Sequence, residues 1–138
     1  MQRVVLDTNV LVSALITPRG ASARLLVELR AGAFELIVSP QLLDELRDVL
    51  WRPKFRRYAT EAEVEAYVDL TRREAMLFDD VEPPTSGPSP IDPDDRFPVD
   101  LARMAGAHTL VSGDAHLLEL RPVVPVMTPG EFLETLDD

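Results

Sequence analysis

The sequence predicts an α/β fold built around a mainly parallel sheet of about five strands. Short apolar runs rich in β-branched residues alternate along the chain with longer stretches of helical periodicity. Polar residues, glycine or proline stand between these segments, as expected for turns. The resulting order of strand, helix, strand and helix is typical of domains in which helices cover a parallel sheet. No internal repeat replaces this order.

The expected strands share a short length and an apolar character. The first ends where polar Asp7, Thr8 and Asn9 follow the apolar run, and another is closed by Gly113 and Asp114. The strands are expected at residues 3–6, 34–38, 76–78, 109–112 and 123–127.

The expected helices are marked by start signals as much as by periodicity. Ser39 and Pro40 supply a cap and a first-turn proline, and the TPGE sequence at 128–131 is a capping box. The stretch 82–98 holds six of the twelve prolines and is expected to be a long loop. Helices are expected at 10–16, 21–31, 40 to about 52, about 60–74, from near 95 to before 108, and after 128.

Length and composition indicate a single globular domain over residues 1–138. Hydrophobic residues make up 46% and charged residues 28%, which is a globular balance. The absence of cysteine excludes disulfides, zinc–thiolate sites and thiol catalysis, and the two histidines, His108 and His116, make a His-rich zinc site unexpected. No apolar run reaches the ~20 residues that span a bilayer, and no signal peptide is recognisable. A soluble cytoplasmic protein without a membrane partner is expected.

The net charge of −10 argues against tight nonspecific binding of nucleic acid, because affinity for phosphates comes mainly from Lys and Arg. A local basic patch could still contact RNA, and Arg52, Lys54, Arg56 and Arg57 form one candidate. A solvated helix end explains that run equally well. The acidity also suits a basic protein partner.

Four carboxylates are the candidate site residues, and topology brings three of them to one edge. Asp7 and Asp114 each follow a strand directly, and Glu45 lies within about two turns of the start of the helix after the second strand. Sites in open parallel sheets form beyond the carboxyl ends of the strands. Asp95 opens a helix after the proline-rich stretch, and its position at this edge is less strongly implied.

Helix phase separates Glu45 from its acidic neighbours. The apolar face of its helix is defined by Leu42, Leu43, Leu46, Val49 and Leu50. At about 100° per residue Glu45 falls at the edge of that face, whereas Asp44 and Asp48 point to the far side. Glu45 is therefore expected to lean over the sheet.

Each acid also has a purely structural interpretation. Asp7 could cap the following helix, although Thr8 and Asn9 are nearer to it. Glu45 could be a surface residue, Asp95 could stabilise a helix N-terminus, and Asp114 could be a turn residue. No single position decides between the two interpretations.

The motifs around these acids resemble those of PIN-domain proteins, in the same order and over nearly the whole chain. The subgroup to which they are most similar is the VapC-like toxins of bacterial toxin–antitoxin systems. The matching segments are VLDTNVLVSA at 5–14, SPQLLDEL at 39–46, DPDDRF at 92–97 followed by Leu101 and Ala102, LVSGDAHLL at 110–118, and MTPGEFL at 127–133.

The resemblance implies a PIN-like α/β/α sandwich and a metal-dependent endoribonuclease. It implies that Asp7, Glu45, Asp95 and Asp114 are the catalytic and metal-site acids, with Asn9 and Ser112 as supporting hydrogen-bonding groups. It further implies an RNA substrate, an antitoxin partner and a homodimer.

Two departures from the family pattern affect these expectations. Many relatives carry another acid near the position of His116, so a second metal ion is less expected here. Pro98 and Asp100 lie in a helix start that is usually more apolar, and the third acid could therefore be Asp94 in place of Asp95.

Crowded carboxylates explain why such a site needs a cation. They repel one another, which raises some of their pKa values unless positive charge offsets them. All-oxygen ligands suit Mg²⁺ or Mn²⁺. We expect Asp7 and Asp114 to be the primary ligands, with Glu45 and Asp95 completing the shell or orienting water.

Two other functions compete with this hypothesis. Phosphoryl transfer through Asp7 is disfavoured for two reasons. Asn9 stands where haloacid-dehalogenase-like enzymes need a second aspartate. Receiver domains need a lysine near the acidic pocket, and the sole lysine, Lys54, lies in a basic loop. A phosphate-binding P-loop sequence is absent. A catalytically silent PIN-fold module that binds protein or RNA remains the alternative.

Overall fold

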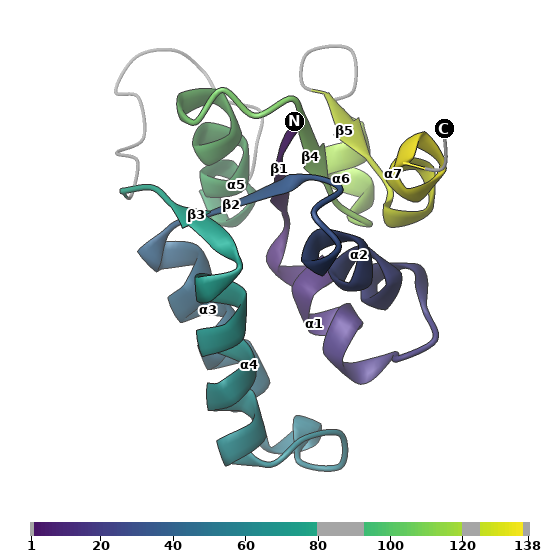
Figure 1. The fold of residues 1–138 in the computed structure, drawn as a ribbon. Helices are drawn as coiled ribbons and strands as arrows, with labels where there is room; N and C mark the ends of the chain where they lie inside the picture. Colours follow the sequence, from purple (N-terminus) through teal and green to yellow (C-terminus); the bar gives the residue numbers. More distant parts are fainter. Residues whose placement is uncertain (1, 80–92, 120–124, 137–138) are drawn as a thin grey trace.

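The computed structural model describes residues 2–79, 93–119 and 125–136, with the side chains of 93–97 and 116 excepted. Figure 1 shows the arrangement of the elements. The strands are β1 (Arg3–Leu6), β2 (Glu35–Val38), β3 (Ala75–Leu77), β4 (Thr109–Val111) and β5 (Val126–Met127). The helices are α1 (Thr8–Ile16), α2 (Ala21–Arg30), α3 (Pro40–Leu50), α4 (Glu61–Arg73), α5 (Pro93–Met104), α6 (Ala115–Leu118) and α7 (Pro129–Leu136), with a 3₁₀ turn at Pro53–Phe55.

The five strands form one parallel sheet in the order β3-β2-β1-β4-β5. The central strand β1 pairs on one side with β2, through Val4 and Leu36, and on the other with β4, through Val4 and Thr109. Val4, Val5 and Leu6 are completely buried, as expected for a parallel strand that is covered on both faces. The predicted α/β fold is confirmed.

Alternation of side chains along the strands divides the core into two layers. Val4, Leu6, Leu36 and Val38 face the larger layer, which also receives apolar residues of α1, α2, α3, α4 and α7. The intervening residues, such as Val5 and Ile37, face the smaller layer with α5 and α6. The molecule is therefore an α/β/α sandwich.

The predicted start signals of two helices are confirmed, and a third helix has a capping box that was not predicted. The Ser39 hydroxyl accepts a hydrogen bond from the backbone N–H of Leu42 (3.3 Å). Thr128 and Glu131 form the predicted capping box, and Thr60 and Glu63 form a second one at α4. Hydrogen bonds from the Thr60 backbone N–H and hydroxyl hold the pKa of the Glu63 carboxyl below its usual value.

The predicted helix start near Asp95 is two residues late, because α5 begins at Pro93, so the predicted loop at 82–98 extended too far. A proline at the first helical position loses no hydrogen bond, so the proline count overstated the loop. Pro98 lies inside α5, where its missing N–H does remove one helical hydrogen bond. Residues 82–92 of that prediction, and Val123 and Val124 of the predicted fifth strand, lie outside the described residues.

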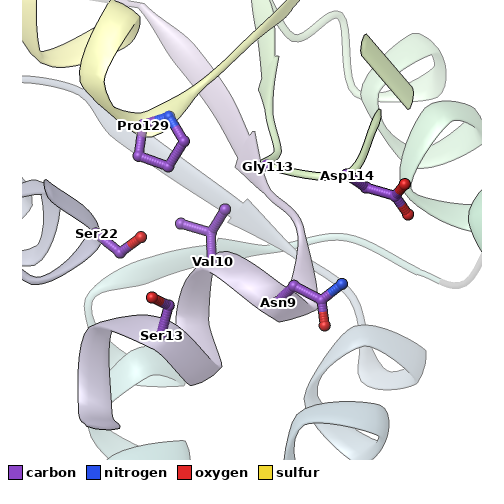
Figure 2. Close-up of a pocket in the computed structure, with 7 residues that line it drawn as sticks. All are labelled: Asn9, Val10, Ser13, Ser22, Gly113, Asp114 and Pro129. Atoms are coloured by element: carbon purple, nitrogen blue, oxygen red, sulfur yellow. The ribbon is translucent and has the colours of Figure 1, made fainter. Parts of the chain in front are cut away.

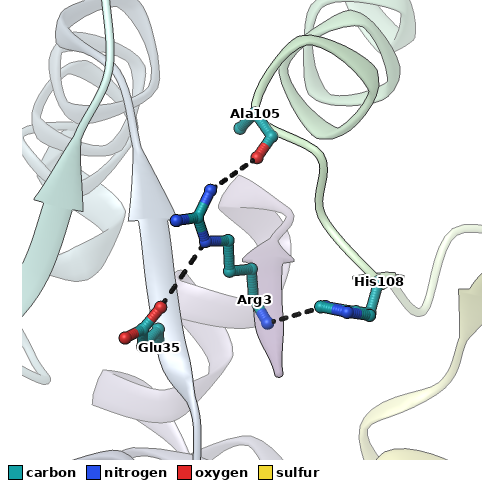
Figure 3. A network of polar contacts seen from close by, with 4 residues as sticks. All are labelled: Arg3, Glu35, Ala105 and His108. Atoms are coloured by element: carbon teal, nitrogen blue, oxygen red, sulfur yellow. Dashed lines mark hydrogen bonds and ion pairs between the residues drawn. The ribbon is translucent and has the colours of Figure 1, made fainter. Parts of the chain in front are cut away.

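Arg3 makes three polar contacts at the amino-terminal edge of the sheet (Figure 3). Its backbone N–H donates to His108 Nδ1 (3.0 Å), and its guanidinium donates to the carbonyl of Ala105 (3.3 Å). Its Nε also lies 3.6 Å from a carboxylate oxygen of Glu35. His108 therefore has a structural role at the amino-terminal ends of the strands.

Helices α3 and α4 form a hairpin that projects from the sheet (Figure 1). The hairpin is tied to α1 by Tyr67, whose hydroxyl donates to the carbonyl of Leu11 at 2.6 Å. Across the described residues no single helix is long and apolar enough to cross a membrane; α1 and α2 meet those criteria only together, as a pair bent by 97°.

Removing the Tyr67 hydroxyl tests this tie. We expect Tyr67→Phe to lower the free energy of unfolding by about 1 kcal/mol, because one buried hydrogen bond is lost while the ring remains. Urea unfolding followed by circular dichroism measures the effect. Tyr58→Phe is the matched control, because Tyr58 is 48% exposed; equal effects of the two changes would contradict the assignment.

The same hydroxyl predicts a pH dependence. Burial raises the pKa of Tyr67 well above its usual value of 10.0. The folded chain therefore holds the phenol proton more tightly, so this contribution is complete below about pH 10 and is lost as pH rises toward the folded-state pKa. The advantage of wild type over Tyr67→Phe should therefore be smaller at about pH 10.5 than at about pH 8 in urea titrations. An advantage that grows over this range would contradict the prediction.

Candidate functional site

Asp7 lies at the carboxyl end of the central strand, with its side chain only 7% exposed. Its backbone N–H continues the sheet by donating to the carbonyl of Val111 (2.9 Å), and its own carbonyl accepts from Val10 (2.9 Å) at the start of α1. Asp7 occupies the N-cap position, yet its side chain makes no capping hydrogen bond. The capping interpretation of Asp7 is therefore wrong.

The Asp7 carboxylate is instead bound by Ser112. The completely buried Ser112 hydroxyl donates to Asp7 Oδ2 at 2.9 Å and accepts from the backbone N–H of Asp114 at 3.0 Å. The Ser112 backbone N–H donates to the carbonyl of Met127 (2.9 Å), so the serine is fixed between two strands. One hydroxyl thus orients the buried carboxylate and the loop that carries Asp114.

Asp114 and Asn9 lie at the same edge. Asp114 is half-buried between β4 and α6, and Asn9 is exposed in the first turn of α1. Both line a hollow of about 320 Å³ that also receives Ser13 and Ser22. In Figure 2, Asn9 lies between Asp114 on one side and the two serines on the other. The remaining lining residues are Val10, Gly113 and Pro129.

Glu45 lies in the second turn of α3 and is half-buried. Its neighbours Leu42 and Leu46 are completely buried, whereas Asp44 and Asp48 are exposed. The predicted helix phase is therefore confirmed, and Glu45 is the acid of this helix that borders the core.

The convergence of all four acids remains a prediction. Among the side chains that the structure describes, no three Asp, Glu or His residues group as ligands of one ion. The backbone of Asp95 lies in α5, but its side chain is not among those described. The hydrogen bonds therefore connect Asp7, Ser112 and the backbone of Asp114, and they leave Glu45 and Asp95 to be tested.

Two further buried polar residues were not predicted as site components. Asp100 on α5 is 8% exposed and is, with Asp7, one of two buried acids among the described side chains. The sequence signalled it only as a polar residue where an apolar one was expected. Thr8 is also buried, and its hydroxyl oxygen has no hydrogen-bond partner among the described residues.

The chemistry of this edge fits a hard divalent cation. A buried carboxylate is costly unless hydrogen bonds or positive charge offset it, and the hydrogen bond from Ser112 contributes to that offset. The Asp7 and Asp114 carboxylates and the Asn9 amide offer oxygen donors, which Mg²⁺ and Mn²⁺ prefer.

Sequence comparison identifies the chain with a known family. The family model described as PIN domain matches residues 3–116. The uncharacterized protein MJ1680 of Methanocaldococcus jannaschii is 27% identical over 146 aligned positions, covering 98% of this chain and 92% of the relative.

Solved structures share the fold at low sequence identity. VapBC2 from Rickettsia felis, solved bound to a DNA fragment from its promoter, aligns with a TM-score of 0.61 and 16% identity, over 92% of this chain and 98% of the other. PAE2754 from Pyrobaculum aerophilum aligns with a TM-score of 0.66 and 14% identity, over 99% and 96% of the two chains. These likenesses concern the fold, and the match of the family model over most of the chain shows that it belongs to the PIN domain family.

Proposed function

We propose that the chain is a metal-dependent endoribonuclease that hydrolyses RNA phosphodiester bonds. The observation that carries this proposal is the buried Asp7 carboxylate, which is oriented by Ser112 and connected through it to the loop of Asp114. Membership of the PIN domain family supports a nuclease role.

In this proposal each residue has a distinct role at the metal site. Asp7 and Asp114 would be the primary ligands of a Mg²⁺ or Mn²⁺ ion, with the Asp7 carboxylate held in one orientation by Ser112. Glu45 and Asp95 would complete the shell or orient the attacking water, and exposed Asn9 would hydrogen-bond to substrate or water. A bound divalent ion would supply an acidic water molecule and screen the negative charge that develops on the phosphate.

The biological role we propose is the toxin of a toxin–antitoxin pair in the cytoplasm. The VapBC2 structure from Rickettsia felis supports it by analogy of fold. A net charge of −10 suits a basic antitoxin, and we propose that the toxin is a homodimer.

A catalytically silent binding module is the second candidate. It is favoured by one observation: the described side chains include no group of three acids around a possible ion. The two candidates differ in whether RNA is cut, which the next experiment measures.

Asp7→Asn removes one negative charge and keeps the shape of the side chain. We expect cleavage of a mixed RNA pool with Mn²⁺ to fall by at least about a hundredfold, because even groups that only support a ligand cost up to that much. Gel electrophoresis of the pool measures cleavage, and EDTA should abolish it in wild type. Asp48→Asn, at an exposed position of α3, should cut like wild type; undiminished Mn²⁺-dependent cleavage by Asp7→Asn would overturn the assignment.

Ser112→Ala tests the role of the serine. Loss of its hydroxyl leaves Asp7 Oδ2 and the Asp114 N–H without that partner, so we expect a stability loss of about 1–3 kcal/mol. The Mn²⁺ concentration for half-maximal cleavage should rise by about 10- to 100-fold. Ser112→Thr retains a hydroxyl and should restore much of the Mn²⁺ response. A Mn²⁺ response that is unchanged in Ser112→Ala would show that the serine acts on folding alone.

A further inference from the structure

The outer end of the α3–α4 hairpin concentrates positive charge in an acidic protein. This hairpin tip, residues 51–58, carries four of the fourteen Lys and Arg residues and none of the twenty-four Asp and Glu. It includes the 3₁₀ turn Pro53–Phe55 and lies at the end of the projecting hairpin in Figure 1. The tip is therefore a local cation cluster that extends away from the sheet.

Among the described residues, no acid forms an ion pair with these cations. The ion pairs formed among the described residues lie elsewhere, at Arg3, Arg47 and Arg73. Arg56 donates to the carbonyl of Leu50, and its Nε and Nη1 atoms find no hydrogen-bond acceptor in the described part of the chain. Arg52, Lys54 and Arg57 are exposed. Their charge is available to a polyanion.

Aromatic rings alternate with these cations. Trp51 is 39% exposed and Tyr58 is 48% exposed. The Arg56 guanidinium lies 6.0 Å from the centre of the Trp51 ring, and that of Arg57 lies 5.1 Å from the centre of the Tyr58 ring. Buried Phe55 anchors the turn between them. Partly exposed aromatic rings interleaved with cations are the combination by which proteins bind single-stranded nucleic acid.

We propose that the hairpin tip is a binding surface for single-stranded RNA, separate from the cleavage site. Arg52, Lys54 and Arg57 would contact phosphates, and the rings of Trp51 and Tyr58 would stack on bases. This surface deepens the proposed ribonuclease function and rests on it for the choice of RNA.

The position of the tip suits a substrate that also reaches the acids. Trp51 is the C-cap of α3 and follows Glu45 by six residues, which corresponds to about 9 Å along the helix axis. An RNA strand that leaves the carboxyl edge of the sheet can therefore follow α3 to the tip.

A second copy of the chain is the competing occupant, because the rest of the molecule holds every acidic residue. Charge alone fits both occupants. The exposed rings distinguish the two occupants. The rings can stack on the bases of RNA, whereas a carboxylate-rich protein surface offers the rings no stacking partner. RNA is the occupant that uses both features of the tip.

Trp51 is the sole tryptophan, so its fluorescence reports directly on the tip. We would titrate a fluorescent single-stranded RNA of about 12 nucleotides in EDTA, which separates binding from metal-dependent cleavage. Wild type should show quenching of Trp51 in parallel with the rise in RNA anisotropy. Trp51→Ala should weaken binding by about tenfold or more.

Charge is tested with a triple variant in which Arg52, Lys54 and Arg57 are each changed to Ala. The slope of log affinity against log salt should become shallower by about 2, because three phosphate contacts are lost from a single strand. The matched control changes exposed Arg19, Arg24 and Arg30 to Ala and should retain the wild-type slope. Circular dichroism checks that both variants fold.

Equal salt slopes for the two triple variants, or unchanged Trp51 emission at RNA saturation, would overturn the proposal. It would also be overturned if the tip variant lost a dimer by light scattering while RNA binding stayed intact. Tip-dependent RNA binding without Mn²⁺-dependent cleavage would support the tip surface and reject the nuclease function.

Discussion

The hydrogen bond between Ser112 and the buried carboxylate of Asp7 is the interaction on which the candidate site depends. The two residues are 105 positions apart in sequence, and the pairing of β1 with β4 brings them together. Burying a carboxylate at this position costs free energy of folding, because burial disfavours its charged form. A fold that retains such a residue is expected to use it. The site is therefore a property of the sheet edge, and its geometry is set by strand register.

The surrounding helices fix that edge from two sides. The larger core layer packs α1, α3 and α4 on one face of the sheet, and Tyr67 ties the projecting hairpin back to the helix that Asp7 begins. The smaller layer holds α5, with buried Asp100, on the other face. Helix α3 carries Glu45 in its second turn and leads at its carboxyl end into the basic hairpin tip. In the function we propose, this separation of charge would let an acidic protein bind a cation at one place and a polyanion at another.

Sequence predicted the features that local physics determines. The strand at 3–6, the Ser39 cap and the phase of Glu45 follow from periodicity and capping chemistry, and each is seen in the structure. Burial of Asp100 and the double hydrogen bonding of Ser112 depend on contacts between distant segments, which a single sequence does not encode in any local pattern. The start of α5 was misplaced because prolines favour loops on average, although Pro93 stands where a helix tolerates one. The convergence of Glu45 and Asp95 on Asp7 follows only from the family resemblance and the expected topology.

The most direct test of the central claim is a crystal structure after a Mn²⁺ soak, read by anomalous scattering. If the buried carboxylate of Asp7 binds a divalent ion, we expect an anomalous peak at direct ligand distance from Asp7 and Asp114, with Glu45 and Asp95 around it. A saturating soak that leaves this edge without a peak, or that places the ion away from Asp7, would contradict the metal-centre account.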